Sequence, residues 1–159
     1  MHKTQLTKWR AKLAQTTDAL GKPIDAGIFD LVLYLNVLGF HTAQSCAGHV
    51  DWGEFAPWVE IEPVYNQSTR WFKVKANQDQ VEKQNLKLHY RFINLLDRFY
   101  HTKKVPYLTT MVTDVAYYSF RLQPVGLARQ KVVSTKERRA QLALYQAEIE
   151  RFTRWLKRQ

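Results

Sequence analysis

The sequence predicts an α+β fold in which helices pack on one side of a mostly antiparallel sheet. Segments with apolar residues at helical spacing are interspersed with short segments in which apolar and polar residues alternate. Their order along the chain, two helices, two or three strands, a helix, two strands and a last helix, is typical of this class. The length of 159 residues and the hydrophobic content of 45% fit a single domain, residues 1–159, with one core.

The first two predicted helices cover residues 4–20 and 28–38. An apolar stripe defines the earlier one, and its members are Leu6, Trp9, Leu13 and Leu20. The later segment is apolar on nearly all sides, with Asp25 in position to cap its start and Gly39 at the usual place after its end. We therefore expect a buried central helix.

Strands are expected after this helix, at residues 40–45 and 58–62. In the second of them apolar and polar side chains alternate, so one face is buried and the other is wet. The two residues on the buried face are Val59 and Ile61. A weaker pattern predicts a third strand at residues 70–75.

A long helix follows at residues 79–100, where apolar side chains recur at helical spacing. Strands at residues 107–113 and 115–123 complete the sheet. Three residues of the second of these strands share its more polar face: Tyr117, Ser119 and Arg121.

The last helix begins at a capping box formed by Ser134 and Glu137. Its apolar stripe consists of Leu142, Tyr145, Ile149, Phe152 and Leu156. The other side of the helix is basic. A helix with one apolar stripe must expose its polar residues, so a solvated basic face is the simplest interpretation, and contact with an RNA or DNA backbone is the functional one. No zinc-finger, RRM or KH signature accompanies these charges.

Composition and charge bound the class of protein. The chain carries 24 basic and 14 acidic side chains, a formal net charge of +10, and this excess favours a polyanionic partner or a basic surface. Residues 25–69 are different, because they hold six carboxylates and no Lys or Arg. The polar start and the lack of a long apolar run predict a cytoplasmic protein without a signal peptide or membrane-spanning helix. With Cys46 as its one cysteine, the chain has neither an internal disulfide nor a four-thiolate zinc site.

The segment Thr42-Ala43-Gln44-Ser45-Cys46-Ala47-Gly48-His49 is the most unusual in composition. Because Gly48 has no side chain, backbone N–H groups near it can approach a ligand closely. Ser45, Cys46 and His49 add a hydroxyl, a thiol and an imidazole. A purely structural interpretation is also open, in which Cys46 is buried, the hydroxyls satisfy local backbone groups and His49 caps the turn.

The stretch from Asp25 through the apolar helix to the Ser45-Cys46-Ala47-Gly48-His49 loop resembles a small group of uncharacterised bacterial and phage proteins with a Ser-Cys-x-Gly-His loop. That resemblance covers about residues 25–62. More distantly, about residues 25–49 resemble the N-terminal part of the wybutosine-synthesis tRNA methyltransferase family, whose comparable strand ends in a Ser-Ser-Cys-Ser-Gly-Arg loop. Gln44 and His49 depart from that loop, where the family has serine and arginine. The resemblance implies that the loop is a functional site.

Metal binding and thiol catalysis are both open to this loop. Cys46 and His49 have Cys-x-x-His spacing and could supply two metal ligands. The remaining ligands would come from Glu60, Glu62, His41 or Asp51. One cysteine and one histidine are a weak zinc signal, and we assign no metal. Thiol catalysis would need a lowered pKa at Cys46 with His49 as base, and the acidic surroundings oppose a thiolate.

Binding of a nucleotide-like anion, free or within RNA, agrees best with the residue types. Aromatic rings would hold a base, the loop N–H groups would hold a phosphate or carboxylate, and Arg121 would supply a cation. The aromatic candidates are Trp52, Trp58 and Tyr117. The residues expected to frame the pocket are Thr42, Ser45, Cys46, Gly48, His49, Trp58, Glu60 and Arg121. We expect Arg121→Ala and Gly48→Val to weaken binding without unfolding the chain, and Cys46 to be largely buried.

Two alternatives belong to other classes of function. The first is an S-adenosylmethionine-dependent RNA-modifying enzyme, which the distant family resemblance and the basic flanks suggest. The second is a basic adaptor whose last helix pairs with another protein through Leu142, Ile149 and Leu156. The sequence assigns no catalytic residue and no cofactor.

Overall fold

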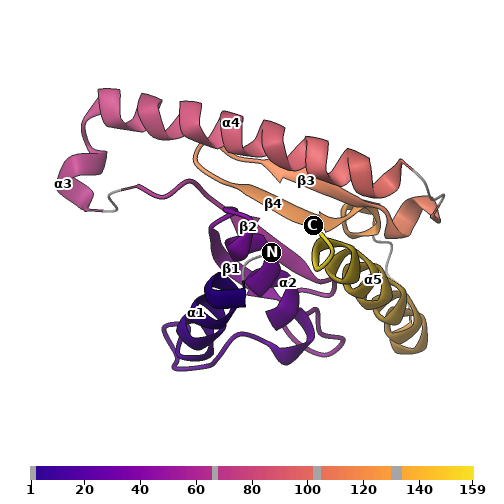
Figure 1. Cartoon of the computed structure of the whole chain (residues 1–159). Helices are drawn as coiled ribbons and strands as arrows, with labels where there is room; N and C mark the ends of the chain where they lie inside the picture. The colour runs from indigo at the N-terminus through magenta and orange to yellow at the C-terminus, as the bar shows by residue number, and fades with distance from the viewer. Residues whose placement is uncertain (1–2, 66–67, 102–104, 130–133) are drawn as a thin grey trace.

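The computed structural model describes residues 3–65, 68–101, 105–129 and 134–159. These residues form the predicted α+β fold (Figure 1). The helices are α1 (Lys3–Ala14), α2 (Ala26–Val37), α3 (Thr69–Phe72), α4 (Lys75–Tyr100) and α5 (Thr135–Leu156), with short 3-10 helices η1 (Tyr107–Thr109) and η2 (Val125–Arg129). The strands are β1 (Thr42–Cys46), β2 (Trp58–Ile61), β3 (Met111–Val115) and β4 (Phe120–Pro124).

The strands form one sheet in the order β1-β2-β4-β3, and each neighbouring pair is antiparallel. β1 and β3 are therefore its edges. Val59 pairs with Leu122 and Ile61 with Phe120, so these four side chains share one face. All four are buried, as the alternation at residues 58–62 predicts for Val59 and Ile61.

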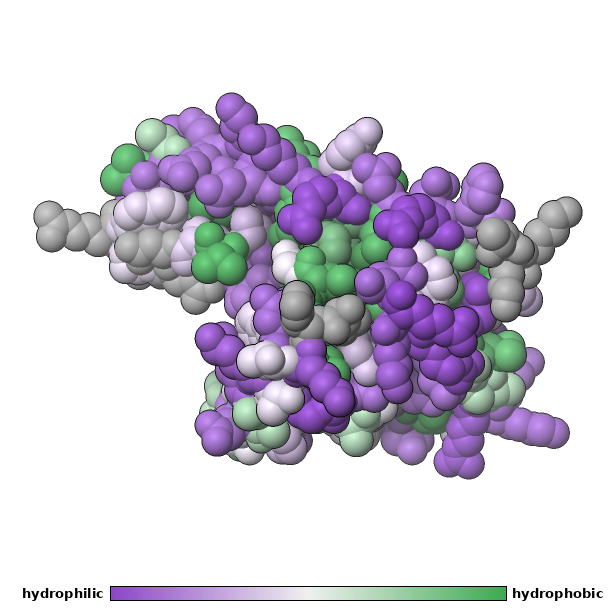
Figure 2. All heavy atoms as spheres, in the orientation of Figure 1, coloured by the Kyte–Doolittle hydropathy of each residue, from purple (hydrophilic) through white to green (hydrophobic). Residues whose placement is uncertain are grey.

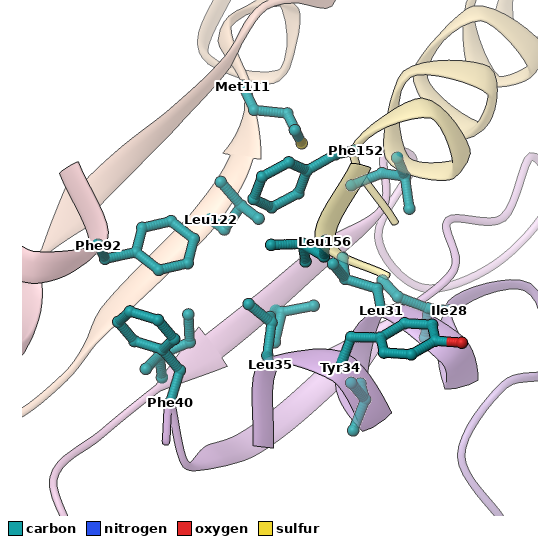
Figure 3. Close-up of a cluster of buried hydrophobic side chains, with 14 of the residues drawn as sticks. Ile28, Leu31, Tyr34, Leu35, Phe40, Phe92, Met111, Leu122, Phe152 and Leu156 are labelled. Atoms are coloured by element: carbon teal, nitrogen blue, oxygen red, sulfur yellow. The ribbon is translucent and has the colours of Figure 1, made fainter. Parts of the chain in front are cut away.

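The core lies between this face of the sheet and helices α2, α4 and α5 (Figure 3). Leu35 of α2, Phe92 of α4 and Phe152 of α5 all point toward Leu122 of β4. Each is at most 1% exposed, and full burial of such a side chain contributes about 1.5–3 kcal/mol. The predicted arrangement, with helices on one side of an antiparallel sheet, is confirmed.

Helix α2 is the central helix of the core. Seven of its twelve residues are buried, in agreement with its apolar sequence on nearly all sides. It ends as predicted, because Gly39 follows it with a φ of +80°, a conformation that glycine adopts without steric strain. Asp25 does stand at the N-cap position, but its side chain makes no capping hydrogen bond.

Helix α1 is shorter than the apolar pattern predicts. The chain leaves the helix after Ala14 and turns at Asp18, whose Oδ1 atom accepts the backbone N–H groups of Leu20 and Lys22 at 2.8 Å each. A carboxylate that binds nearby backbone N–H groups stabilises a turn in competition with helix. The prediction of a helix to residue 20 is therefore wrong, and Leu20 is 80% exposed instead of lying on a buried stripe.

The strand predicted at residues 70–75 is also wrong, because this segment forms α3 and the start of α4. Asn77 and Gln78, in the first turn of α4, donate their side-chain N–H groups to the carbonyl oxygens of Trp71 and Phe72, at 2.6 and 2.9 Å. These local bonds satisfy carbonyl groups that a strand would pair with a neighbour. Helix α4 consequently begins earlier than predicted and ends at the predicted residue.

The strands predicted at residues 107–113 and 115–123 form one hairpin that is shifted along the chain. Residues 107–109 form η1, and the turn between β3 and β4 lies at residues 116–119. Asn85 of α4 is fully buried beside this turn and donates to the carbonyl oxygens of Ala116 and Ser119, at 3.0 and 3.1 Å. A tertiary contact thus determines where the hairpin turns.

Helix α5 begins at the predicted capping box. The Ser134 hydroxyl oxygen accepts the N–H of Glu137 at 3.3 Å, and the Ser134 N–H donates to the Glu137 carboxylate at 2.8 Å. The predicted apolar stripe is buried throughout, and its members are Leu142, Tyr145, Ile149, Phe152 and Leu156. The stripe packs within the chain itself, so the side chains assigned to the adaptor interface are not available on the surface.

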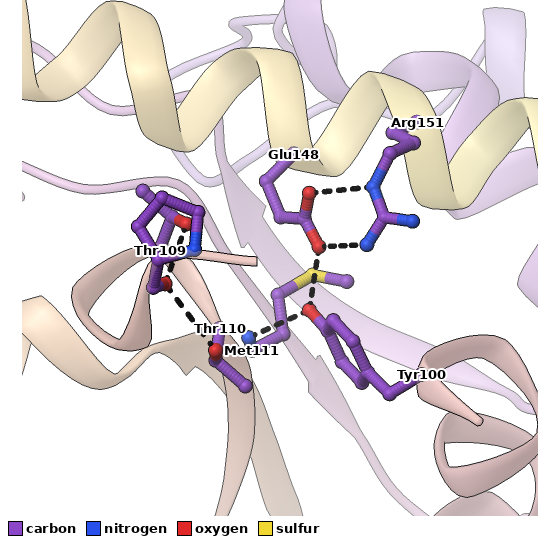
Figure 4. Close-up of polar contacts among 7 residues, drawn as sticks. Tyr100, Thr109, Thr110, Met111, Glu148 and Arg151 are labelled. Carbon is purple, nitrogen blue, oxygen red and sulfur yellow. Dashed lines mark hydrogen bonds and ion pairs between the residues drawn. The ribbon is translucent and has the colours of Figure 1, made fainter. Parts of the chain in front are cut away.

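A buried polar network joins α4, α5 and β3 (Figure 4). Glu148 is 6% exposed and accepts two hydrogen bonds from the Arg151 guanidinium, at 2.6 and 2.7 Å. The Tyr100 hydroxyl donates to Glu148 at 2.7 Å and accepts the backbone N–H of Met111 at 2.9 Å. The buried carboxylate is thereby both paired and hydrogen-bonded, as a buried charge requires.

The face of the molecule seen in Figure 2 is mainly hydrophilic, and its hydrophobic residues form separate spots. The described helices include none with the length and apolar character needed to cross a bilayer.

Candidate functional site

The end of β1 and the loop after it lie against the N-terminal end of α2. Ser45 and Cys46 are the last residues of β1 and pair with Val59 and Trp58 of β2. The chain then turns through Gly48, which has a φ of +81°. The first five residues of the segment Thr42–His49 therefore belong to the sheet as β1, and the loop itself begins at Ala47.

Asp25 holds this loop from outside. Its Oδ2 atom accepts the backbone N–H of Ala47 at 3.0 Å and lies 3.3 Å from Nε2 of His49. The Asp25 side chain, which at this position would ordinarily cap α2, thus binds the loop after β1 instead. Two further loop N–H groups also have partners, because Gly48 donates to the Cys46 sulfur at 3.4 Å and His49 to the carbonyl oxygen of Glu54 at 2.8 Å.

These bonds change the expected role of the loop backbone. The sequence suggests that the loop N–H groups bind a phosphate or carboxylate of a ligand. In the structure the Ala47 N–H binds a carboxylate of the chain itself, and its neighbours bind a thiol and a carbonyl group. An anionic ligand must therefore find its partner elsewhere.

Cys46 is largely buried, at 8% exposed, as predicted. Burial is the largest influence and raises the pKa of its thiol; the hydrogen bond from the Gly48 N–H lowers this pKa, and the charges of Asp25 and Glu54, each a smaller influence, raise it again. Its sulfur atom, an Asp25 carboxylate oxygen and a His49 ring nitrogen all lie within 4.8 Å of one another.

Aromatic stacking fixes the His49 ring. It lies on the ring of Trp52, with 3.6 Å between centroids and 18° between planes. The Lys22 ammonium lies 5.4 Å from the centroid of the same Trp52 ring, within the range of a cation–π contact. Trp52 itself is 60% exposed, so much of its surface is accessible.

Helix α5 packs against the loop. Gln146 donates its side-chain N–H to the carbonyl oxygen of Ala47 at 3.0 Å. A Cβ atom at Gly48 would lie 2.7 Å from Leu142 of α5 and 2.9 Å from the backbone of Ala56. With its positive φ, this position excludes larger residues, so Gly48→Val would disturb the fold. The expectation that it only weakens binding is corrected.

A cavity of about 610 Å³ adjoins this loop, between β1 and the segment that joins α1 to α2. Five of the predicted pocket residues line it: Thr42, Ser45, Cys46, His49 and Trp58. Asp25, Trp52 and Lys22 line it as well. The Trp58 indole N–H is buried without a hydrogen-bond partner among the described residues, and the Thr42 hydroxyl oxygen accepts the Asn36 side-chain N–H at 2.7 Å.

The other three predicted pocket residues, Gly48, Glu60 and Arg121, do not line the cavity. Arg121 stacks over the Trp58 ring, with 4.0 Å from its guanidinium carbon to the ring centroid, and pairs with Glu54 at 3.6 Å. Glu60 accepts the Ser119 hydroxyl at 2.7 Å. Glu60 and Arg121 pair with each other and lie on the face of the sheet opposite Val59 and Leu122, whereas Gly48 is in the loop after β1.

Tyr117 is the other predicted aromatic candidate that lies elsewhere. It is 74% exposed in the turn between β3 and β4 and does not line the cavity. The prediction that it shares a strand face with Arg121 fails because the strand begins only at Phe120.

The alternative metal ligands named from the sequence are also placed apart from Cys46. His41 and Glu62 lie 3.9 Å from each other (Nδ1 to Oε1), and neither joins the group formed by Asp25, Cys46 and His49. Asp25 is the carboxylate that lies beside Cys46 and His49. The sequence did not point to this position, because an aspartate directly before an apolar helix is expected to cap that helix.

Lys22 was not among the residues that the sequence predicted for the pocket. It is the one Lys or Arg on the cavity wall among the described residues. The Asp18 turn brings it there, and no periodicity in the sequence signals that turn. On α5, by contrast, Arg151 and Arg154 pair with Glu148 and Glu150 on their own helix, so part of the basic charge is balanced locally.

The antiparallel pairing of every described strand differs from the parallel sheet of Rossmann methyltransferases. Comparison of the chain with protein-family models, with curated proteins and with solved structures finds no match.

Proposed function

We propose that the chain binds a nucleotide-like ligand, free or as part of RNA, in the cavity beside the Ser45–His49 loop. The observation that carries the proposal is that Trp52 and Lys22, an exposed aromatic ring with a cation over it, meet on the wall of this cavity. His49 covers one face of the Trp52 ring, so a base would stack on the other face, where it would take the place of the Lys22 ammonium, and the ammonium would bind the phosphate.

The size and the polar groups of the cavity support the same class of ligand. A volume of about 610 Å³ lies within the usual range for small-molecule sites of roughly 300–1,000 Å³. Thr42 and Ser45 contribute hydroxyl groups from β1, which can donate to or accept from a base edge.

Lys22 replaces Arg121 as the proposed contact for the anionic group. Arg121 is engaged by Glu54 and by the Trp58 ring, whereas Lys22 lines the cavity. Arg121→Ala is therefore expected to change binding less than Lys22→Met does.

Isothermal titration calorimetry with the four ribonucleoside monophosphates and a short single-stranded RNA tests the proposal. Trp52→Ala should lower affinity by about tenfold to 100-fold, since stacking of one base contributes about 1–3 kcal/mol. Lys22→Met should lower it by about tenfold and weaken its salt dependence.

Matched controls lie outside the cavity. Lys12 lies over the Trp9 ring at 4.7 Å, much as Lys22 lies over the Trp52 ring. Because Lys12 is outside the cavity, Lys12→Met should leave binding unchanged. Tyr117→Ala removes an exposed aromatic ring that does not line the cavity and should also have no effect. Absence of binding to all of these ligands, or equal losses in the control variants, would refute the proposal. The same titration is made with S-adenosylmethionine. Binding of S-adenosylmethionine without binding of any nucleotide or RNA would favour the alternative of an RNA-modifying enzyme.

A further inference from the structure

The three side chains that approach one another at the cavity wall are a carboxylate, a thiol and an imidazole, from two parts of the chain: Asp25 before α2, and Cys46 and His49 at the end of β1 and in the loop after it. We propose that Asp25, Cys46 and His49 form a zinc-type metal site. This inference goes beyond ligand binding and does not depend on it. It is carried by the distances among the three groups and by the contacts that hold each of them.

The distances are close to those around a bound ion. Ligand atoms about 2.0–2.3 Å from a tetrahedral zinc ion lie about 3.5 Å from each other. His49 Nε2 and Asp25 Oδ2 are already 3.3 Å apart, and the Cys46 sulfur lies within 4.8 Å of both. Side-chain rotations that shorten the distances to the sulfur by about 1 Å would complete the geometry.

Each of the three groups is oriented by a second contact. Asp25 Oδ2 accepts the Ala47 N–H, the Cys46 sulfur accepts the Gly48 N–H, and the His49 ring stacks on Trp52. Outer contacts of this kind orient metal ligands, and an N–H bonded to sulfur stabilises the thiolate that a metal requires.

The loop that carries two of the groups is rigidly supported. Helix α5 binds the Ala47 carbonyl through Gln146 and packs Leu142 against Gly48 with no room for a Cβ atom. Preorganisation of this type reduces the conformational freedom lost when an ion binds.

The donor set selects the class of metal. A thiolate and an imidazole suit zinc and neighbouring transition metals, whereas magnesium and calcium prefer an all-oxygen set. The group has three protein ligands among the described residues, which is the number found in zinc sites that keep one position open. All three residues line the cavity, so the open position would be accessible from it.

Cobalt(II) substitution of the chelator-treated chain tests the site directly. We expect one Co²⁺ per chain, with visible bands of tetrahedral cobalt and a near-ultraviolet sulfur-to-cobalt charge-transfer band, and displacement by Zn²⁺. Cys46→Ser should abolish the charge-transfer band. Cys46→Ser, His49→Gln and Asp25→Ala should each lower Zn²⁺ affinity by more than about 100-fold, because loss of outer contacts alone lowers it by 10–100-fold in other sites.

Control variants separate this site from adventitious binding. His89→Gln and Asp30→Asn remove a histidine and a carboxylate outside the group and should leave Zn²⁺ affinity unchanged. Circular dichroism shows whether each variant is folded. If Asp25→Ala does not fold, the Zn²⁺ affinity of Cys46→Ser tests the proposal. Binding below one equivalent, or equal Zn²⁺ affinity of the wild type and Cys46→Ser, would overturn the proposal. Nucleotide titrations of the metal-free chain keep the failure of either proposal distinct.

Discussion

Asp25 accepts the backbone N–H of Ala47 at 3.0 Å, and this bond joins the start of helix α2 to the loop after β1. The same carboxylate oxygen lies 3.3 Å from His49. One side chain therefore positions both the backbone and the imidazole of the candidate site. Without Asp25 the loop would retain Gln146 and the Gly48 packing, but the Ala47 N–H would have no acceptor.

Asp25→Ala is expected to lower the free energy of unfolding by about 1.5–3 kcal/mol, the usual contribution of a hydrogen bond to a charged group. Asp30→Ala, within helix α2, should lower it by less than about 1 kcal/mol, because among the described residues the side chain of Asp30 pairs with Arg10 in an exposed ion pair. Urea unfolding measures both. Similar losses in the two variants would contradict the assignment, as would unchanged hydrogen exchange of the Ala47 amide in Asp25→Ala.

Cys46 should react slowly with a thiol reagent near neutral pH in the folded, metal-free chain. It is 8% exposed, and burial raises the pKa of its thiol, so the reactive thiolate fraction is small. Unfolding in urea should make the reaction fast. Cys46→Ser should keep the fold and most of the nucleotide affinity. Fast modification of the folded chain with complete loss of binding would favour a thiol enzyme instead.

Tyr100→Phe should lower the free energy of unfolding by about 1–3 kcal/mol, because the buried Met111 N–H loses its acceptor and Glu148 loses a donor. Tyr90→Phe on the same helix α4 is the control, since Tyr90 is 68% exposed and its change should lie within about 0.5 kcal/mol. Thermal and urea unfolding of the pair provide the measurement. A loss in Tyr100→Phe no larger than that in Tyr90→Phe would show that the network in Figure 4 contributes little.

Stability should fall as the pH is lowered, in part through His89. Burial lowers the pKa of His89 below its ordinary value of 6.5, so the unfolded chain takes up a proton before the folded chain does. The contribution of His89 is therefore complete above pH 6.5 and is lost as the pH falls through the folded-state pKa.

His89→Gln should reduce the loss of unfolding free energy between about pH 7.5 and about pH 5. Glutamine can keep the hydrogen bond that His89 makes with the Thr113 hydroxyl at 2.7 Å. An identical pH profile for wild type and His89→Gln would contradict this prediction.

Local sequence patterns were sufficient to predict the elements whose burial is periodic. The apolar helix before Gly39, the alternation of Val59 and Ile61, and the capping box at Ser134 each depend on neighbours along the chain. Because the physical cause is local in each case, the fold class and these elements followed from sequence alone. Cys46 was also correctly expected to be buried.

The tertiary structure decided what distant residues bring to one place. Asp25 reaches Ala47 and His49, Asn85 determines where the β3–β4 hairpin turns, and the Asp18 turn carries Lys22 to the cavity. Asp25 and Asn85 find their partners across the fold, whereas Asp18 stabilises a local turn; in all three cases a polar residue has no periodicity that reveals its partner in advance. The sequence by itself therefore determined the framework, whereas the composition of the candidate site depended on contacts made only after the chain had folded.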